Sequence, residues 1–353
     1  MDVIMTTLEQ IRGIYQKLED TASRDIFNQR LLYSLSGDYR YINEMISLEM
    51  KRHGREDIMA ELLSWAEAEG KEVVIFGAGF AGMQIANVLG YQGRQVRCFV
   101  DNDETLQGSL VGGLQVCAPG MLRELKECRV VIGTNSCVAE IKEQLRGMGI
   151  LEEWIFTPQK TWWLGPQRQY FDLDIIRPHD KENFIDAGAF DGEDSQAFIK
   201  WCGGDYKAIH LFEPDADNFK KAGLAALEDQ RITMYNEGLW SSSGELKFLS
   251  GNREKSVITM DGDVSVKVTT IDEKLNGEAV TLIKMDIEGS EREALKGAEK
   301  TIRKYRPRLA VCVYHKPEDI IEIPQKILEL NGAYKLFLRH YSYMHTETVL
   351  YAI

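Results

Sequence analysis

The sequence has 353 residues, which suggests about two domains. With 44% hydrophobic and 27% charged residues, its composition is that of an ordinary globular protein. Asp and Glu outnumber Lys and Arg by 55 to 42, and the formal charge of −13 would repel a polyanion at long range. We therefore expect no nucleic acid partner. No run of about 18 apolar residues occurs, so no membrane-spanning helix is predicted.

The start of the chain and the cysteines bear on the compartment. Residues 1–9 contain no basic patch followed by an apolar stretch, so no secretory signal is predicted. None of the six cysteines forms a C-x-x-C pair, which favours reduced thiols. We expect a cytoplasmic protein.

Residues 1–68 are expected to form a helical lead-in. Apolar residues recur there at three-to-four spacing, as in Leu8, Ile11, Tyr15 and Leu18. Such a stripe is typical of a core or a dimer contact, so these helices are a candidate surface for a homo-oligomer.

Residues 69–157 change to an alternation of strands and helices. Strands are predicted at 73–76, 96–100 and 130–132, and helices at 81–89 and 138–146. This alternation predicts a parallel, doubly wound α/β sheet of the Rossmann type.

A G-x-G-x-x-G turn joins the first strand of this domain to its first helix. Gly77 allows the tight turn, Gly79 lets a phosphate approach the backbone, and Gly82 lets the helix pack closely on the strand. Asp101 ends the second strand, where a ribose-binding acid would lie. These four residues are a candidate site for a nucleotide or nucleotide-sugar.

The stretch from Phe99 to Val116 resembles the N-terminal domains of certain sugar acyltransferases and the nucleotide-binding domain of sugar epimerases. A nicotinamide-dependent sugar enzyme that uses this domain is therefore an alternative function. No acid or base for hydride transfer is evident here, which weakens that alternative.

Residues 158–181 contain three prolines and several aromatic residues, including Trp162, Trp163, Tyr170 and Phe171, and are predicted to be a linker. A second series begins after it and forms the domain 182–353. Its predicted strands are 183–186, 208–212, 232–236, 280–286, 309–313, 334–339 and 348–353. The fold class is α/β, with two doubly wound Rossmann-like domains, of which the second ends in a late hairpin as class I methyltransferases do.

The second glycine-rich turn has the form D-x-G-x-x-x-G, with Asp186, Gly188 and Gly192. An acid at Asp186 would repel a pyrophosphate but suits a cationic ligand such as S-adenosylmethionine, and the glycines leave room for its methionine part. Glu213 ends the next strand, where a carboxylate can accept both ribose hydroxyls.

Two further strand ends complete the predicted pocket. Glu237 and Gly238 follow the third strand and would lie beside the adenine ring. Asp286 and Glu288 follow the fourth strand, where the chain changes abruptly from apolar to charged. Polar groups at the carboxyl ends of such strands point into the binding crevice.

Together, the D-x-G-x-x-x-G turn, the F-E-P segment 212–214, the segment 270–272 and the K-M-D-I-E-G-S-E run from Lys284 resemble the FkbM family of methyltransferases. The resemblance covers about the last 170 residues. It implies methyl transfer from S-adenosylmethionine to a hydroxyl oxygen of a saccharide or small metabolite. Asp186, Gly188 and Glu213 would bind the cofactor, and Asp286 and Glu288 would line the transfer site.

His315 stands where many members of that family carry a glutamate. Because a histidine has an ordinary pKa of about 6.5, His315 is one candidate for the base and Asp286 is the other. No metal site is predicted, since nothing in the spacing requires one. A scaffold that binds the cofactor without catalysis is the remaining alternative.

Overall fold

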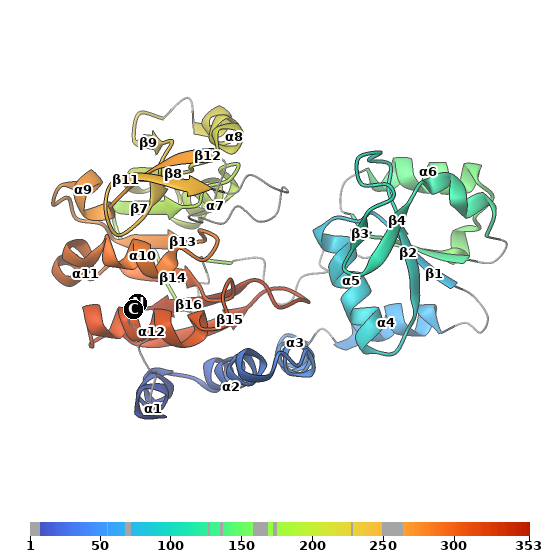
Figure 1. Cartoon of the computed structure of the whole chain (residues 1–353), viewed down its shortest axis with the longest axis horizontal. Coiled ribbons are helices and arrows are strands. Elements are labelled where there is room, and N and C mark those ends of the chain that lie inside the picture. The colour runs from blue at the N-terminus through green and yellow to red at the C-terminus, as the bar shows by residue number, and fades with distance from the viewer. Residues whose placement is uncertain are drawn as a thin grey trace. The chain divides into compact units, whose positions relative to one another are not determined.

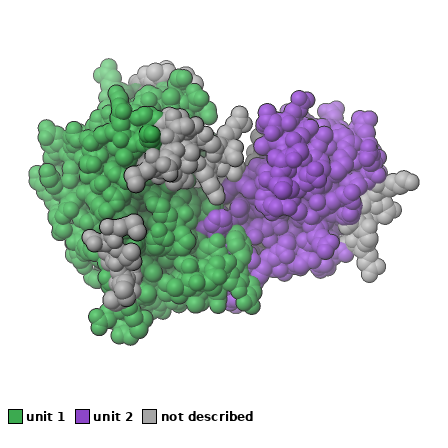
Figure 2. Space-filling view, in the orientation of Figure 1, with its two compact units in different colours: residues 1–41, 166–340, 346–353 green, residues 42–165, 341–345 purple. Residues whose placement is uncertain are grey.

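The computed structural model describes residues 8–54, 56–67, 72–125, 128–134, 137–157, 169–171, 175–226, 229–248 and 264–353. The chain forms two compact units (Figure 2). Unit 1 contains residues 1–41, 166–340 and 346–353, and unit 2 contains residues 42–165 and 341–345. No helix in the described ranges is long and apolar enough to cross a membrane.

Unit 1 is built on a seven-stranded sheet. Its strands are β7 (Glu182–Ala187), β8 (Tyr206–Phe212), β9 (Ile232–Tyr235), β13 (Leu282–Met285), β14 (Arg308–Cys312), β15 (Leu336–His340) and β16 (Thr348–Ala352). They lie in the order β15-β16-β14-β13-β7-β8-β9 (Figure 1). Adjacent strands from β14 through to β9 are parallel, and β16 runs antiparallel to both its neighbours. The predicted doubly wound sheet with a late hairpin is confirmed.

The central strands of this sheet are buried on both faces, as parallel strands between two helical layers must be. Every residue of β7, β13 and β14 is buried. The helices of the series are α7 (Glu193–Trp201), α8 (Ala216–Ala226), α9 (Ile271–Leu275), α10 (Glu291–Lys296), α11 (Glu299–Tyr305) and α12 (Asp319–Leu330). This rigid centre fixes the loops that follow β7, β8, β13 and β14.

The first two helices, α1 (Leu8–Lys17) and α2 (Thr21–Ser36), pack within unit 1 against α12 and the edge strand β15. The hydroxyl of Ser23 accepts a hydrogen bond from the Leu338 amide at 2.9 Å, and Arg339 pairs with Asp20 at 2.7 Å. The helical start of the chain is therefore attached to the sheet rather than forming a separate layer.

A small second sheet, which the sequence patterns did not predict, also belongs to unit 1. It consists of β10 (Gly238–Leu239), β12 (Val264–Thr269) and β11 (Gly244–Phe248), in that order. The strand β12 pairs in parallel with β10 and antiparallel with β11.

Unit 2 begins within α3 (Arg40–Arg52), at Ile42, and continues with α4 (Glu56–Ala66). Its six-stranded sheet has the order β3-β4-β2-β1-β5-β6. The strands are β1 (Glu72–Phe76), β2 (Val96–Val100), β3 (Leu110–Val111), β4 (Leu114–Cys117), β5 (Cys128–Ile132) and β6 (Ile155–Phe156). The helices α5 (Phe80–Tyr91) and α6 (Val138–Gly147), with the short 3₁₀ helices η1 (Pro119–Arg123) and η2 (Glu152–Trp154), complete it.

The predicted linker 158–181 falls partly outside the described residues, and Trp162 and Trp163 lie in the part that is not described. Of the remainder, Phe171 is buried in unit 1 and packs on the rings of Phe184, Phe198 and Trp201. The linker thus supplies a piece of the core of unit 1.

Candidate functional site

The carboxyl edge of the seven-stranded sheet brings together four of the predicted site residues. Asp186 ends β7, Glu213 follows β8, Asp286 follows β13, and His315 lies just after β14. Because these strands are parallel and adjacent, their ends meet at one edge of the sheet. This edge is the candidate active site.

Asp186 at this edge is already paired with a lysine. The buried Lys284 of β13 lies opposite Asp186 in the strand register, and its Nζ is 3.0 Å from Oδ1 of Asp186 and 2.9 Å from Asp194. The Lys284 ammonium also donates to the Gly188 carbonyl at 2.7 Å, and Ser195 donates to Asp186 at 2.7 Å. Burial opposes the lysine's charge, but the two aspartates raise its pKa well above the ordinary value. Asp186 thus fixes the glycine-rich turn through Lys284.

Glu213 is held by the backbone in a way that leaves it able to bind a ligand. Its two oxygens accept the amides of Phe190 and Asp215, each at 2.9 Å. A carboxylate has about four acceptor positions, so both oxygens can accept further hydroxyls. Burial raises the pKa of Glu213 to about 7, against the lowering effect of the two amides.

Asp286 accepts from two tyrosines and faces one histidine. The hydroxyl of Tyr170 donates to it at 2.7 Å and that of Tyr314 at 3.2 Å, while Nε2 of His315 lies 3.3 Å away. Burial works against the charge, yet His315, Lys284 and the Tyr170 hydroxyl hold the pKa of Asp286 well below its usual range. Asp286 is therefore a fixed anion.

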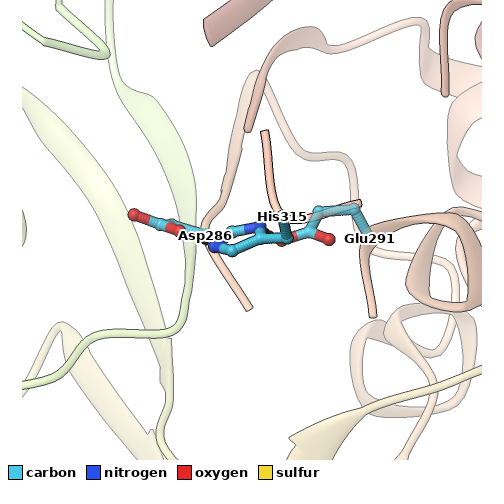
Figure 3. A group of neighbouring side chains, drawn as sticks. All are labelled: Asp286, Glu291 and His315. Atoms are coloured by element: carbon cyan, nitrogen blue, oxygen red, sulfur yellow. Dashed lines mark ion pairs between the residues drawn. The ribbon is translucent and has the colours of Figure 1, made fainter. Parts of the chain in front are cut away.

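His315 lies between two carboxylates (Figure 3). Its Nδ1 is 3.1 Å from Glu291, its Nε2 faces Asp286, and Glu288 lies 3.6 Å from the same Nε2. Burial lowers the imidazole's affinity for a proton, but the carboxylates outweigh it and raise the pKa of His315 to about 11. A histidine that already carries both protons cannot accept a third, which argues against the role of base considered from the sequence.

The same three side chains, Asp286, Glu291 and His315, are close enough to share a metal ion. The geometry favours a different arrangement, because the two ring nitrogens point to different carboxylates. The protonated ring then supplies the positive charge between them.

The charge of His315 leads to a pH prediction. Because its folded-state pKa of about 11 exceeds the unfolded value of 6.5, the stabilisation is complete below pH 6.5 and is lost as the pH rises toward 11. We expect His315→Gln to lower the free energy of unfolding most near pH 6. The difference from the unchanged protein should shrink by up to about 1.4 kcal/mol per pH unit above that.

Urea titrations between pH 6 and pH 9 measure this effect, and His179→Gln, at an exposed histidine, is the control. A His315→Gln penalty that is constant over this range would mean that His315 is neutral in the folded protein.

The other predicted site residues lie at the margin of this edge. Glu237 forms an ion pair with Lys274 at 2.6 Å, and Gly238 is buried in β10 of the small sheet. Gly192 precedes α7 as its N-cap, and the Glu288 side chain is 46% exposed. Of these residues, Glu288 has its carboxylate next to the charged imidazole of His315.

In unit 2, the first glycine-rich turn has the predicted close packing. A Cβ atom on Gly82 would lie 2.0 Å from the Gly77 carbonyl oxygen, whereas one on Gly79 would meet nothing within 4 Å. Asp101 accepts the Ala78 amide at 2.8 Å. The two units therefore share one hydrogen-bonding pattern, in which the acid that follows the second strand accepts an amide of the glycine-rich turn. Asp101 accepts the amide of Ala78, and Glu213 accepts the amide of Phe190.

Four residues that the structure places at the edge have no role predicted from the sequence: Lys284, Tyr170, Tyr314 and Glu347. Lys284 had a usable signal, since it is a lone charge inside an apolar strand. Tyr170 and Glu347 come from the linker and from the turn before β16, and no local pattern marks them.

Two family models match parts of the chain. The strand order of the seven-stranded sheet and the acids at its carboxyl edge are those of a class I methyltransferase fold. Residues 186–344 match the model of the methyltransferase FkbM domain. Residues 69–156 match the model of the C2185-like N-terminal domain.

Among solved structures, the methyltransferase FkbM from Methylobacillus flagellatus KT is similar at 20% identity and a TM-score of 0.49, over 90% of this chain and 100% of that one. Aeropyrum pernix fibrillarin with natively bound S-adenosyl-L-methionine matches at 11% identity and a TM-score of 0.33, over 49% and 67%. The precorrin-6y C5,15-methyltransferase from Geobacter metallireducens GS-15 matches at 11% and 0.35, over 55% and 92%. No curated protein sequence matches the chain.

Proposed function

We propose that unit 1 transfers a methyl group from S-adenosylmethionine to a hydroxyl oxygen of a saccharide or small metabolite. The observation that carries this proposal is Glu213, an acid held by two backbone amides at the end of β8, with acceptor positions left on both oxygens. The FkbM domain match over residues 186–344 supports it.

The residues at the edge fit S-adenosylmethionine, a cationic ligand. The role of Asp186 differs from the one predicted from the sequence. Glu213 would accept the ribose hydroxyls, and the carboxylates of Asp194, Asp286 and Glu288 make the edge favourable for positive charge. Asp186 would act differently, because Lys284 already neutralises it at 3.0 Å. Its role is to hold the turn that contains Gly188.

The bound cofactor would supply an electrophilic methyl group on its sulfonium. The chain's own task is then to orient a hydroxyl in line with that group and to take its proton. Asp286, fixed by Tyr170, Tyr314 and His315, would hold the hydroxyl or the sulfonium in place. His315 acts as a positioning residue that keeps Asp286 ionised.

Calorimetric titration with S-adenosylmethionine and with its demethylated product, S-adenosylhomocysteine, tests the binding half of this proposal. We expect Glu213→Gln to weaken both ligands about 10- to 100-fold, because a glutamine loses hydrogen bonds from a charged acceptor. The matched control is Glu278→Gln, at a partly exposed acid that precedes β13 and pairs with Lys207. Binding of neither ligand to the unchanged chain would refute the proposal.

For unit 2 we propose a nucleotide or nucleotide-sugar ligand at Gly77, Gly79, Gly82 and Asp101. The open space over Gly79 and the carboxylate of Asp101 at the turn support it. Thermal-shift measurements with NAD and a nucleotide-sugar test it, and a response to NAD alone would favour the nicotinamide-dependent alternative. The cytoplasmic location and an oligomer through the first helices stay predictions.

A further inference from the structure

Glu347, just before β16, places a carboxylate beside the candidate active site. Oε1 of Glu347 lies 3.4 Å from the Tyr314 hydroxyl, and Gln169 donates to Oε2. Its backbone is in the left-handed region, with a φ of 66°, which is uncommon for a residue other than glycine. Such strain is tolerated where the surrounding contacts hold a functional side chain in place.

Three other acids of the edge already have partners. Asp286 is surrounded by two hydroxyls and the His315 ring, and Glu291 accepts the Ile287 amide and faces His315. Asp186 is paired with Lys284. Of these, Asp286 has a pKa held well below its usual range, so it is a weak base.

Glu347 differs from these acids in its surroundings. Burial and the nearby charge of Asp286 raise the pKa of Glu347 to about 7, although Gln169, His315 and Tyr314 act in the opposite direction. Its carboxyl group therefore exchanges a proton near neutrality, where a general base is most effective. The residue is also partly exposed.

Tyr314 connects this acid to the site. Its hydroxyl oxygen is 3.2 Å from Asp286 and 3.4 Å from Glu347, and its single proton can be donated to only one of them. When Tyr314 donates to Asp286, a protonated Glu347 can donate to the Tyr314 oxygen. A proton taken up by Glu347 can therefore be shared with the Tyr314 oxygen.

We propose that Glu347 is the general base that takes the proton of the acceptor hydroxyl. In this step the O–H bond breaks and its proton moves to the Glu347 carboxylate, while the oxygen forms a bond to the methyl carbon. The methyl–sulfur bond breaks and its electron pair stays on sulfur. The assignment rests on the proposed methyl transfer from S-adenosylmethionine.

Proton release on binding tests the assignment without a known acceptor. A base that serves the reacting hydroxyl must lie near the sulfonium, so S-adenosylmethionine should lower the pKa of Glu347 more than S-adenosylhomocysteine, which lacks the sulfonium charge, does. Calorimetry of the full chain at pH 7 in buffers of different ionisation enthalpy measures this. We expect S-adenosylmethionine to release up to about half a proton more than S-adenosylhomocysteine, given a pKa of about 7.

Glu213 also has a pKa near 7, but both ligands carry the same ribose, so its contribution cancels in the difference. Glu347→Gln should abolish the extra proton release and leave the affinity for S-adenosylhomocysteine within about twofold, which also shows that the variant is folded. Glu278→Gln should keep the extra release.

The outcomes separate the two proposals. If the unchanged chain binds neither ligand, the proposed methyl transfer fails. If both bind but the extra proton release is absent, or survives in Glu347→Gln, then Glu347 is not the base.

Discussion

Replacing Lys284 by methionine should lower the free energy of unfolding of unit 1 by about 3–5 kcal/mol, the usual cost of removing one partner of a buried ion pair. Lys284 is 2% exposed, and the Asp186 that it neutralises is fully buried. Asp194, 36% exposed, can recover its hydration, but Asp186 cannot. Urea titration, monitored by hydrogen exchange of peptides from β7 and β13, measures the lost free energy of unfolding in unit 1 itself.

The same substitution at Lys207 is a matched control, because that lysine is 60% exposed and pairs with Glu278 at the surface. We expect Lys207→Met to change stability by less than about 1 kcal/mol. Adding Asp186→Asn to Lys284→Met should recover part of the loss, since the uncompensated charge is then gone. A Lys284→Met loss no larger than that of Lys207→Met would show that Asp186 does not depend on the lysine.

Gly188→Ala is expected to have the second large effect. A Cβ atom there would lie 1.8 Å from the Asp286 carbonyl oxygen, and the residue has a φ of 80°. Backbone strain and overpacking together should destabilise unit 1 by about 2 kcal/mol or more. The turn can relieve the clash only by moving away from Asp286, so the affinity for S-adenosylmethionine should fall as well.

Gly204→Ala is the control that separates the steric clash at Gly188 from the strain of a positive φ. Gly204 has the same φ of 80°, but a Cβ atom there would meet nothing within 4 Å. Replacing Gly204 by alanine should therefore lower the free energy of unfolding only by the cost of backbone strain. Equal losses for the two variants, measured by the same hydrogen exchange, would mean that the approach of Gly188 to Asp286 is not tight.

The strands of the seven-stranded sheet, and β1, β2 and β5 of unit 2, could be predicted because they are short apolar runs between turn residues. The predicted strand 309–313, for example, is β14 at Arg308–Cys312. The short strands β3, β4 and β6 of unit 2 were not predicted. The small sheet was missed although β12 alternates apolar and polar residues from Val264 to Thr269. Its partner β10 has only two residues, which is too few for a pattern.

The chemistry of the site depended on contacts that the sequence does not contain. The sequence predicts a cofactor-binding role for Asp186 because nothing local shows its partner. Lys284 lies 98 residues further along the chain, and only the register of β7 and β13 brings the two side chains together. An imidazole of ordinary pKa predicts a base at His315. The structure surrounds it with carboxylates from the loop after β13 and from α10.

The most direct test of the central claim is hydrogen exchange of the full chain with and without S-adenosylmethionine. If the edge formed by β7, β8 and β13 binds this ligand, peptides that cover residues 186–195, 212–215 and 285–291 should gain protection. The turn at 77–82 in unit 2 should exchange as before. Protection confined to residues 77–82, or none anywhere at saturating ligand, would contradict the account.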